Sequence, residues 1–326
     1  MTPELFDYLG KIDELKEYHR LGGSISIADE QLQTLLHKAC IANEYSTVEF
    51  LLSSGALVDP VDKAYRTPLS YAAEFASENI IRLLMQAGAD LSSTDTQDMT
   101  PLHYACRRNQ LDIVEALLDD YENQHRKIPR LEYRVDKLKK TPMEYALKHG
   151  NEQVVCKLLE KRVSQYVDDL FQQAVMNDML MVVQILLERG TDPNETTLRN
   201  PVPAINYAKS YDMAQLLIQY GAQINTEETY NSSGEYFTPL AGAVRGNDVK
   251  LIKFLVSEGV DVNAAVDGFG AVALHWACLN GSIEAIKCLL ELGADINAVD
   301  EDKQDVFGYA GNEEVKEFLK TYKQSK

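Results

Sequence analysis

The chain of 326 residues has no apolar run approaching the eighteen or so residues that a membrane-spanning helix needs. Its start, Met1 to Gly10, has neither a basic beginning nor an apolar stretch, so we expect no common secretory signal. Basic residues are also scarce, with 32 Lys and Arg against 50 Asp and Glu and a formal charge of −18. Because nucleic acids and anionic membranes favour basic surfaces, we expect neither as a partner.

Cysteine is sparse and odd in number. The chain has five, at Cys40, Cys106, Cys156, Cys278 and Cys288. A disulfide framework would use an even number, so free thiols in a reducing compartment are expected. This favours a cytoplasmic location.

The motifs of common catalytic and nucleotide sites are missing. No G-x-x-x-x-G-K-[ST], H-E-x-x-H or G-x-S-x-G sequence occurs. Gly268 to Ala273 matches a loose G-x-G-x-x-A pattern, but a dinucleotide fingerprint needs a preceding buried strand within a βαβ unit and an acidic residue about 20 positions later. We therefore expect a turn there, and no catalytic residue, cofactor or metal.

What the chain has instead is an internal repeat. A marker alanine recurs with spacings of 33, 33, 41, 28, 34, 35, 34 and 33 residues, at Ala39, Ala72, Ala105, Ala146, Ala174, Ala208, Ala243, Ala277 and Ala310. A period near 33 is typical of stacked helix-turn-helix units, each of which buries its apolar face only against its neighbours.

One repeat shows the expected anatomy. Thr67 is a good N-cap and Pro68 suits the first helical position, and Leu69, Ala72 and Ala73 follow at the spacing of a buried stripe. A second helix is predicted around Ile80 to Gln86, with Gly88 as a left-handed C-cap.

These motifs give the chain a family resemblance. The segments Thr67 to Ala73, Thr100 to Cys106 and Leu290 to Asn297 resemble the ankyrin-repeat family, over about residues 30 to 320. The resemblance implies an all-α solenoid, curved and elongated, of helix pairs with short β-hairpin fingers. It also implies that partners bind on the concave side formed by the fingers and the first helices.

We expect one ankyrin domain over residues 1–326 with irregular parts. Its predicted parts are a degenerate N-terminal capping repeat (1–23), repeats one to three (24–120), a basic insertion (121–140), irregular repeats four to six (141–225), a second insertion (226–235), repeats seven and eight (236–300) and a C-terminal capping repeat with a shortened first helix (301–326). The irregular repeats should be the weakest part of the stack.

Three His-x-Ala-Cys elements, at His37/Cys40, His103/Cys106 and His275/Cys278, place two metal-ligand residue types one turn apart. No third or fourth ligand follows at zinc spacing. The resemblance instead implies that each histidine bonds neighbouring fingers and that each cysteine replaces a buried alanine.

A column of aromatic residues just before the marker alanine has two interpretations. Its members are Tyr71, Tyr104, Tyr145, Tyr207, Trp276 and Tyr309. They either face the concave side as interface anchors or pack between repeats with only their polar tips near water.

A basic island stands out in this acidic chain. It comprises Arg126, Lys127, Arg130, Arg134, Lys137, Lys139 and Lys140 in the insertion, with Arg107, Arg108, Lys148 and His149 on adjacent first helices. One interpretation is a site for an acidic or phosphorylated segment of a partner protein at repeats three and four. The alternative is a solvated loop.

Further candidate contacts lie at finger tips and helix ends. By family position they are Tyr65, Arg66, Met99, Tyr236, Phe237 and Phe269, with Phe75 and Arg245 at the ends of first helices. Aromatic and arginine side chains supply most interface energy when they are buried by a partner.

The sequence therefore favours a non-catalytic scaffold, expected to be a monomer, that binds another protein through the concave groove. One alternative is an ankyrin-type effector secreted by an intracellular bacterium or parasite and acting in the host cytosol. Another is an enzyme with a site around His125, His149 and Asp168.

Overall fold

The arrangement of the chain is described by a computed structural model over residues 6–124, 131–160, 169–196, 201–224, 229–230 and 236–324. Side chains are described for these residues except 120–124, 229–230 and 236–237. Contacts divide the chain into two compact units, Met1–Asp168 and Asp169–Lys326. The boundary falls in the stretch predicted to be irregular, and each unit is described by itself.

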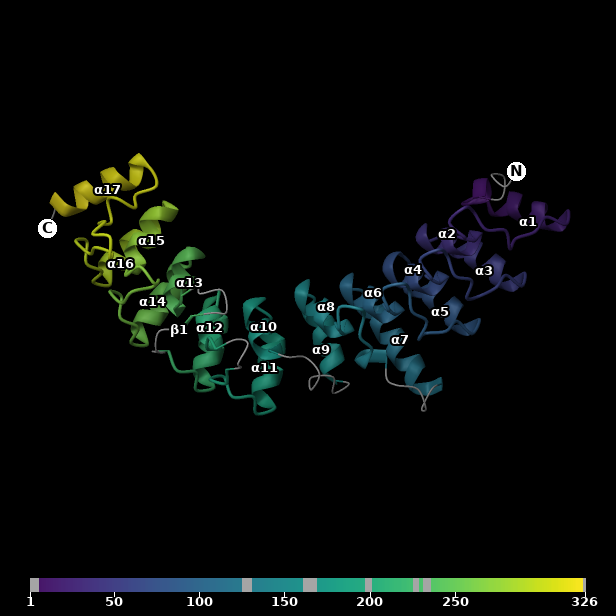
Figure 1. Ribbon diagram of the computed structural model, residues 1–326, viewed down its shortest axis with the longest axis horizontal. Helices are drawn as coiled ribbons and strands as arrows, with labels where there is room; N and C mark the ends of the chain where they lie inside the picture. The colour runs from purple at the N-terminus through teal and green to yellow at the C-terminus, as the bar shows by residue number, and fades with distance from the viewer. Residues whose placement is uncertain are drawn as a thin grey trace. The chain divides into compact units, whose positions relative to one another are not determined.

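The first unit is a stack of helix pairs. A 3-10 turn, Phe6–Tyr8, and helix α1 (Ile12–Arg20) precede the pairs α2 (Leu35–Ile41) and α3 (Tyr45–Ser53), α4 (Pro68–Phe75) and α5 (Glu78–Gln86), α6 (Pro101–Arg107) and α7 (Leu111–Gln124), and α8 (Pro142–Lys148) and α9 (Glu152–Glu160). Figure 1 shows α2, α4, α6 and α8 side by side in one layer and their partners in a second. The first layer consists of the first helices of the repeats.

The residues predicted to begin and end the helices do so. The Thr67 hydroxyl accepts the N–H of Ser70 at 3.3 Å, and Pro68 is the first residue of α4. The second helix begins at Glu78, and Gly88 follows it with a φ of 89°. This left-handed backbone is one that glycine adopts without a Cβ clash, so it can end the helix there.

The second unit repeats the same pattern, except that one first helix is replaced by a short 3-10 helix. Its elements are α10 (Leu170–Met176) and α11 (Leu180–Glu188), a 3-10 helix (Ala204–Tyr207) and α12 (Tyr211–Gln219), α13 (Pro239–Arg245) and α14 (Val249–Ser257), α15 (Ala273–Asn280) and α16 (Ile283–Glu291), and α17 (Glu313–Gln324). The short 3-10 helix takes the place of the first helix of repeat six, one of the repeats predicted to be irregular.

The C-terminal repeat differs from the expectation. A shortened helix was predicted around Ala310, whereas Phe307–Ala310 forms a turn and only α17 is helical in this repeat. Gly311 explains the break, because a Cβ built there would lie 2.7 Å from the carbonyl oxygen of Leu279. The backbone approaches α15 too closely for a regular helix with side chains.

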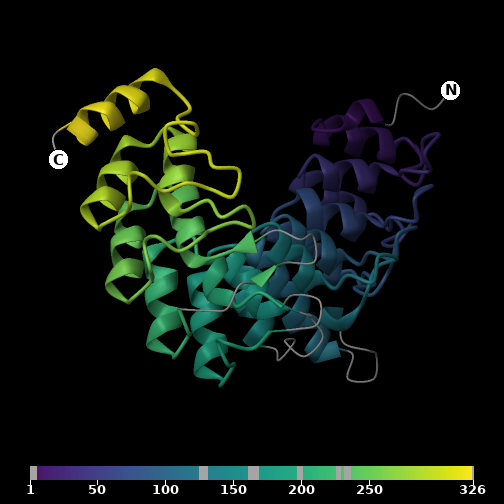
Figure 2. The same cartoon turned by 60° about the vertical axis from the view of Figure 1, so that its left-hand side comes forward.

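The fingers are the loops that join one repeat to the next, and Figure 2 shows them projecting on one side of the helix pairs in each unit. Neighbouring fingers share a backbone hydrogen bond of 2.9 Å, from Lys63 to Gln31, Thr96 to Ala64, Lys137 to Gln97 and Glu301 to Phe269. Within the described residues the two-stranded sheet is β1 (Thr229–Tyr230) with β2 (Tyr236–Phe237), an antiparallel pair. Elsewhere the fingers contain isolated bridges such as Ala28 with Thr34.

The core lies between the two helix layers of each unit. The marker alanines Ala39, Ala72 and Ala105 are fully buried, which lets adjacent first helices approach closely. The five cysteines are free and buried, as expected for small apolar residues. Burial raises the pKa of the Cys278 thiol to about 12. Among the described residues, no helix is long and apolar enough to cross a membrane.

Candidate functional site

Each regular finger is built around one aspartate. The Asp62 carboxylate accepts the backbone N–H groups of Ala64 and Arg66 at 2.8 and 3.0 Å, which closes the turn. The same pattern recurs at Asp95, Asp136 and Asp267. These finger aspartates, with Asp300, hold the exposed tips in a fixed conformation.

The aromatic column is tied to the finger aspartates. Four tyrosines donate their hydroxyl, and Trp276 its indole N–H, to the aspartate nine residues earlier: Tyr71 to Asp62, Tyr104 to Asp95, Tyr145 to Asp136, Trp276 to Asp267 and Tyr309 to Asp300. Partial burial, and then these bonds, raise the pKa of Tyr71, Tyr145 and Tyr309 to about 12. The column thus fixes each finger against its first helix.

This geometry corrects part of the predicted binding surface. Tyr104 and Tyr207 are only 5% and 8% exposed, so the packing interpretation holds for them and they are not presented to a partner. Met99, predicted at a finger tip, is only 6% exposed because its side chain turns into the core. Tyr71, Tyr145 and Trp276 are half-buried.

The histidines bond neighbouring fingers, as the resemblance implied. In His103 the Nδ1 atom accepts the Thr100 N–H at 3.1 Å, while Nε2 lies 3.2 Å from the carbonyl oxygen of Lys140 in the next finger. His37 and His275 repeat this arrangement. Burial lowers the pKa of His37 and His103, which keeps both rings neutral at pH 7. Over the part of the chain that the structure describes, no group of three or more His, Cys, Asp or Glu could hold a metal ion.

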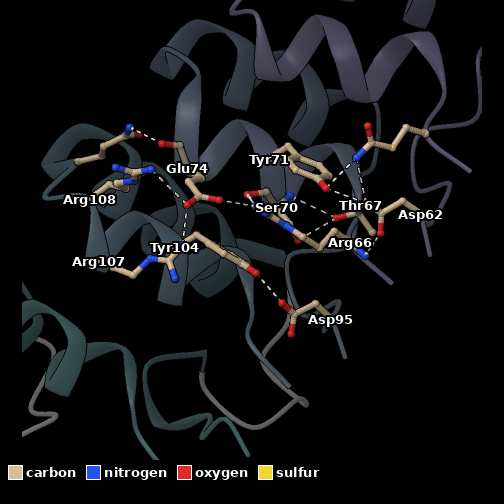
Figure 3. Close-up of polar contacts among 12 residues, drawn as sticks. Asp62, Arg66, Thr67, Ser70, Tyr71, Glu74, Asp95, Tyr104, Arg107 and Arg108 are labelled. Atoms are coloured by element: carbon tan, nitrogen blue, oxygen red, sulfur yellow. Dashed lines mark hydrogen bonds and ion pairs between the residues drawn. The ribbon is translucent and has the colours of Figure 1, made fainter. Parts of the chain in front are cut away.

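A cluster of three arginines on one buried glutamate is the most distinctive polar feature of the first unit (Figure 3). Glu74, at the end of α4, has a side chain only 6% exposed. Its Oε2 atom accepts from Arg66 at 2.7 Å, and its Oε1 atom accepts from Arg107 at 2.5 Å and Arg108 at 3.5 Å. We call these four residues the arginine cluster.

Aromatic rings hold the guanidinium groups of the cluster in place. Arg66 lies between the rings of Tyr71 and Tyr104, with its Cζ atom 3.8 and 4.1 Å from their centroids. Arg107 lies 4.9 Å from the Tyr104 centroid. Arg66 is therefore a structural element, only 14% exposed, although it was predicted as a finger-tip contact.

The two other arginines remain accessible. The side chain of Arg107 is 32% exposed and that of Arg108 is 49% exposed. Arg108 lies 5.3 Å from the ring of Phe75, which is itself 41% exposed at the end of α4. Lys148 and His149 are exposed at the corresponding end of α8. A basic strip thus follows the C-terminal ends of α6 and α8, and it consists of Arg107, Arg108, Lys148 and His149.

The predicted basic island is thus divided between two places. Lys137, Lys139 and Lys140 lie in the finger closed by Asp136, before α8 begins, whereas the basic strip lies at the opposite end of the first helices. A helix of seven residues, such as α8, separates the two by roughly 10 Å. Residues 136–140 are therefore the finger of repeat four, so any extra segment relative to its neighbours precedes them.

Two of the finger tips expose an aromatic side chain. Tyr65 and Phe269 are 62% and 69% exposed. Tyr65 and Leu32 occupy equivalent turns with φ of 60° and 62°, a left-handed conformation that is unfavourable for bulky side chains. In the second unit Arg245 is exposed, with Cζ 5.7 Å from the ring of Trp276.

Several predicted residues fall outside this description. Tyr236 and Phe237 form strand β2, but their side chains are not described. Arg126, Lys127 and Arg130 of the island lie outside the described residues, as do His125 and Asp168 of the enzyme alternative. His149, the third residue of that alternative, lies exposed at the end of α8.

Glu74 was not singled out from the sequence, although it organises the site. Its position gave no signal, because the equivalent residues of the next two repeats are Arg107 and Lys148. The finger aspartates were also missed, but their constant separation of nine residues from the aromatic column could have identified them.

Comparison with known proteins agrees with the helix pairs and fingers. A family model that describes three copies of the ankyrin repeat matches four segments of the chain, residues 8–95, 88–169, 171–265 and 204–300. An ankyrin repeat protein of fowlpox virus (strain NVSL), FPV014, is 32% identical over 139 residues, which are 42% of this chain and 30% of that protein. The ankyrin repeat protein nuc-2 of Neurospora crassa is 28% identical over 57% of this chain and 18% of its own length.

Some relatives are named for activities. The palmitoyltransferase akr1 of Schizosaccharomyces pombe is 49% identical over 63 residues, which are 19% of this chain and only 10% of that enzyme. This chain covers less than a third of each of these three relatives. The family model spans most of the chain, and the helix pairs, the caps and the finger hydrogen bonds all agree with it, so the chain belongs to the ankyrin-repeat family.

Proposed function

We propose that the first unit binds a partner protein and that an acidic or phosphorylated segment of this partner lies on the basic strip of Arg107, Arg108, Lys148 and His149. Ankyrin repeats serve as scaffolds for protein–protein interaction, and this general role applies to the chain as a family member. The observation that carries the proposal is the pair of partly exposed arginines beside an exposed aromatic ring, Phe75.

Electrostatics support this surface over others. The chain carries a formal charge of −18, so most of its surface repels an acidic partner. A concentration of positive charge against that background steers an acidic segment to one place and disfavours other docking orientations. The Phe75 ring adds apolar area that a partner can bury, and clustered aromatic and arginine residues are typical of interface hot spots.

The finger tips extend the same proposed interface. Tyr65 is exposed on the finger that precedes α4, and its left-handed backbone carries a cost that glycine would avoid and that asparagine or aspartate would lessen. Such a cost at an exposed aromatic residue favours a role in binding.

Site-specific photo-crosslinking tests this proposal. A photoreactive phenylalanine analogue at Phe75 should crosslink one defined protein from the native cell extract, whereas the same analogue at Tyr45, 41% exposed on α3, should not. Arg108→Glu should reduce the crosslinked product at least tenfold. Arg20→Glu, an equal change of charge at a 71% exposed arginine of α1, should leave it unchanged.

Two results would remove the proposal. One is a crosslinking pattern that is the same from Phe75 and Tyr45. The other is an equal response of the crosslinked product to the two charge reversals, which would mean that only the net charge of the chain matters.

A further inference from the structure

We infer that the basic strip recognises a phosphoryl group within an otherwise neutral extended peptide, with Arg107 and Arg108 as its ligands. The inference rests on the proposed function, because it names the chemistry of the segment bound there. It is argued from the charges of the arginine cluster, the unused donors of its arginines and an adjoining groove.

The arginine cluster has three positively charged groups and one negatively charged group. Three guanidinium groups converge on the single carboxylate of Glu74, and within the described residues no other carboxylate forms an ion pair with them. Among the described residues, the carboxylates of Asp95 and Asp136 in the adjoining fingers form no ion pair with these arginines, and they accept backbone N–H groups and a tyrosine hydroxyl instead. A carboxylate ligand would offset one of the two excess charges, whereas a phosphoryl group, with a charge of about −1.5 to −2, offsets both.

The exposed guanidinium groups still have hydrogen-bond donors to offer. Each carries five N–H groups, and Arg107 and Arg108 each use one Nη atom on the same oxygen of Glu74. Glu74 and the rings of Tyr104 and Phe75 limit the rotation of both side chains. Two oriented forks match the three oxygens of a phosphoryl group, which accept bidentate bonds from arginine.

An open groove begins beside these arginines and has a volume of about 590 Å³. Its lining includes Ala76 and Asn109, which directly follow Phe75 and Arg108 in the chain. Four of its lining residues carry carboxamides, Asn79, Asn109, Gln110 and Gln153, of which Gln110 already donates to the carbonyl oxygen of Glu74 at 3.2 Å. Carboxamides both donate and accept, so they suit the N–H and C=O groups of an extended peptide backbone.

The charges that line the groove favour a phosphorylated peptide over a generally acidic one. Glu78 and Asp112 line it, and Glu78 is paired with Arg82, so a run of acidic residues along the groove would meet the like charge of Asp112. A single phosphorylated side chain at the arginines, followed by uncharged residues, avoids this repulsion.

Nuclear magnetic resonance titration of the full chain tests the inference. The probe is the peptide acetyl-Gly-Gly-phosphotyrosine-Gly-Gly-amide, with its tyrosine and glutamate counterparts and inorganic phosphate as comparisons. The phosphopeptide should shift the side-chain Nε–Hε signals of Arg107 and Arg108 and bind at least tenfold more tightly than the glutamate peptide. Arg108→Lys keeps the charge but loses the planar guanidinium group and should weaken binding about fivefold to tenfold, whereas Arg20→Lys, at a 71% exposed arginine of α1, should have no effect.

The possible failures separate the inference from the proposed function. Equal affinity for the phosphotyrosine and glutamate peptides would overturn phosphoryl recognition, and so would inorganic phosphate binding as tightly as the phosphopeptide. If neither occurs but Arg108→Lys binds like the wild type, the arginine fork is not the ligand and the inference also fails. In all these cases the crosslink from Phe75 and its loss in Arg108→Glu would still support partner binding at the strip.

Discussion

Replacing Glu74 by glutamine should destabilise the first unit while leaving the second unchanged. The substitution removes the one carboxylate that Arg66, Arg107 and Arg108 share. Arg66 suffers most, because its side chain is only 14% exposed and cannot regain water as the other two can. The buried guanidinium group of Arg66 would then have only neutral acceptors, the amide oxygen of the glutamine and the carbonyl oxygen of Ser70.

The size of the effect follows from these exposures. A hydrogen bond to a charged group contributes about 1.5–3 kcal/mol, and the buried pair of Arg66 with Glu74 belongs to this class. The two partly exposed pairs each add about 0–1 kcal/mol after screening by solvent. Because glutamine still accepts one bond, we expect a loss of roughly 2–3 kcal/mol for Glu74→Gln.

Urea unfolding with two signals measures this loss. Trp276 is the single tryptophan and lies in the second unit, so its fluorescence reports that unit, whereas far-ultraviolet circular dichroism reports all helices. In Glu74→Gln, the part of the dichroism transition that reports the first unit should move to a lower urea concentration. The fluorescence transition of Trp276 should stay at the same urea concentration. The control Glu78→Gln breaks only a surface ion pair with Arg82 and should cost less than about 0.5 kcal/mol. A loss below about 1 kcal/mol for Glu74→Gln would refute the reasoning, and so would an equal shift of the fluorescence transition.

Further predictions concern buried histidines, a charged turn and a finger tip. Since burial lowers the pKa of His37 and His103 in the folded state, the unfolded chain binds more protons, and stability should fall as the pH drops from about 7 towards 5. Urea midpoints at several pH values should show this fall, and replacing both histidines by glutamine should flatten it. Partial desolvation raises the pKa of Asp59, so replacing it by the neutral asparagine should stabilise the fold by about 1 kcal/mol. The new side chain could donate to a glycine carbonyl, as Asn263 does to Gly293. Thermal unfolding measures this, and a lower midpoint for Asp59→Asn would contradict it. Tyr65→Gly should stabilise the fold by about 1 kcal/mol, because it relieves a φ of 60°, yet weaken partner binding; unchanged binding would exclude the tip from the interface.

Much of the fold could be predicted because ankyrin repeats are specified locally. Thr67 and Pro68 begin a helix by capping, and Gly88 ends one by adopting a positive φ, without help from distant residues. The C-terminal repeat was less predictable, because the turn around Ala310 depends on the contact of Gly311 with Leu279 in another repeat.

The candidate site was predictable in part. The sequence indicated Arg107 and Arg108, since basic residues are conspicuous in an acidic chain. It did not show that Tyr104 is buried or that Arg66 serves the interior, because both outcomes depend on Glu74 and on ring stacking between repeats. Side-chain contacts of this kind arise only when neighbouring repeats are placed side by side.

The most direct test of partner binding at the basic strip is the affinity of the purified partner, identified by the Phe75 crosslink, for charge-reversed chains. We predict that Arg108→Glu weakens this affinity at least tenfold and that Arg20→Glu does not change it. Equal affinity for the wild type and Arg108→Glu would contradict the proposal that the first unit recognises its partner through Arg107 and Arg108.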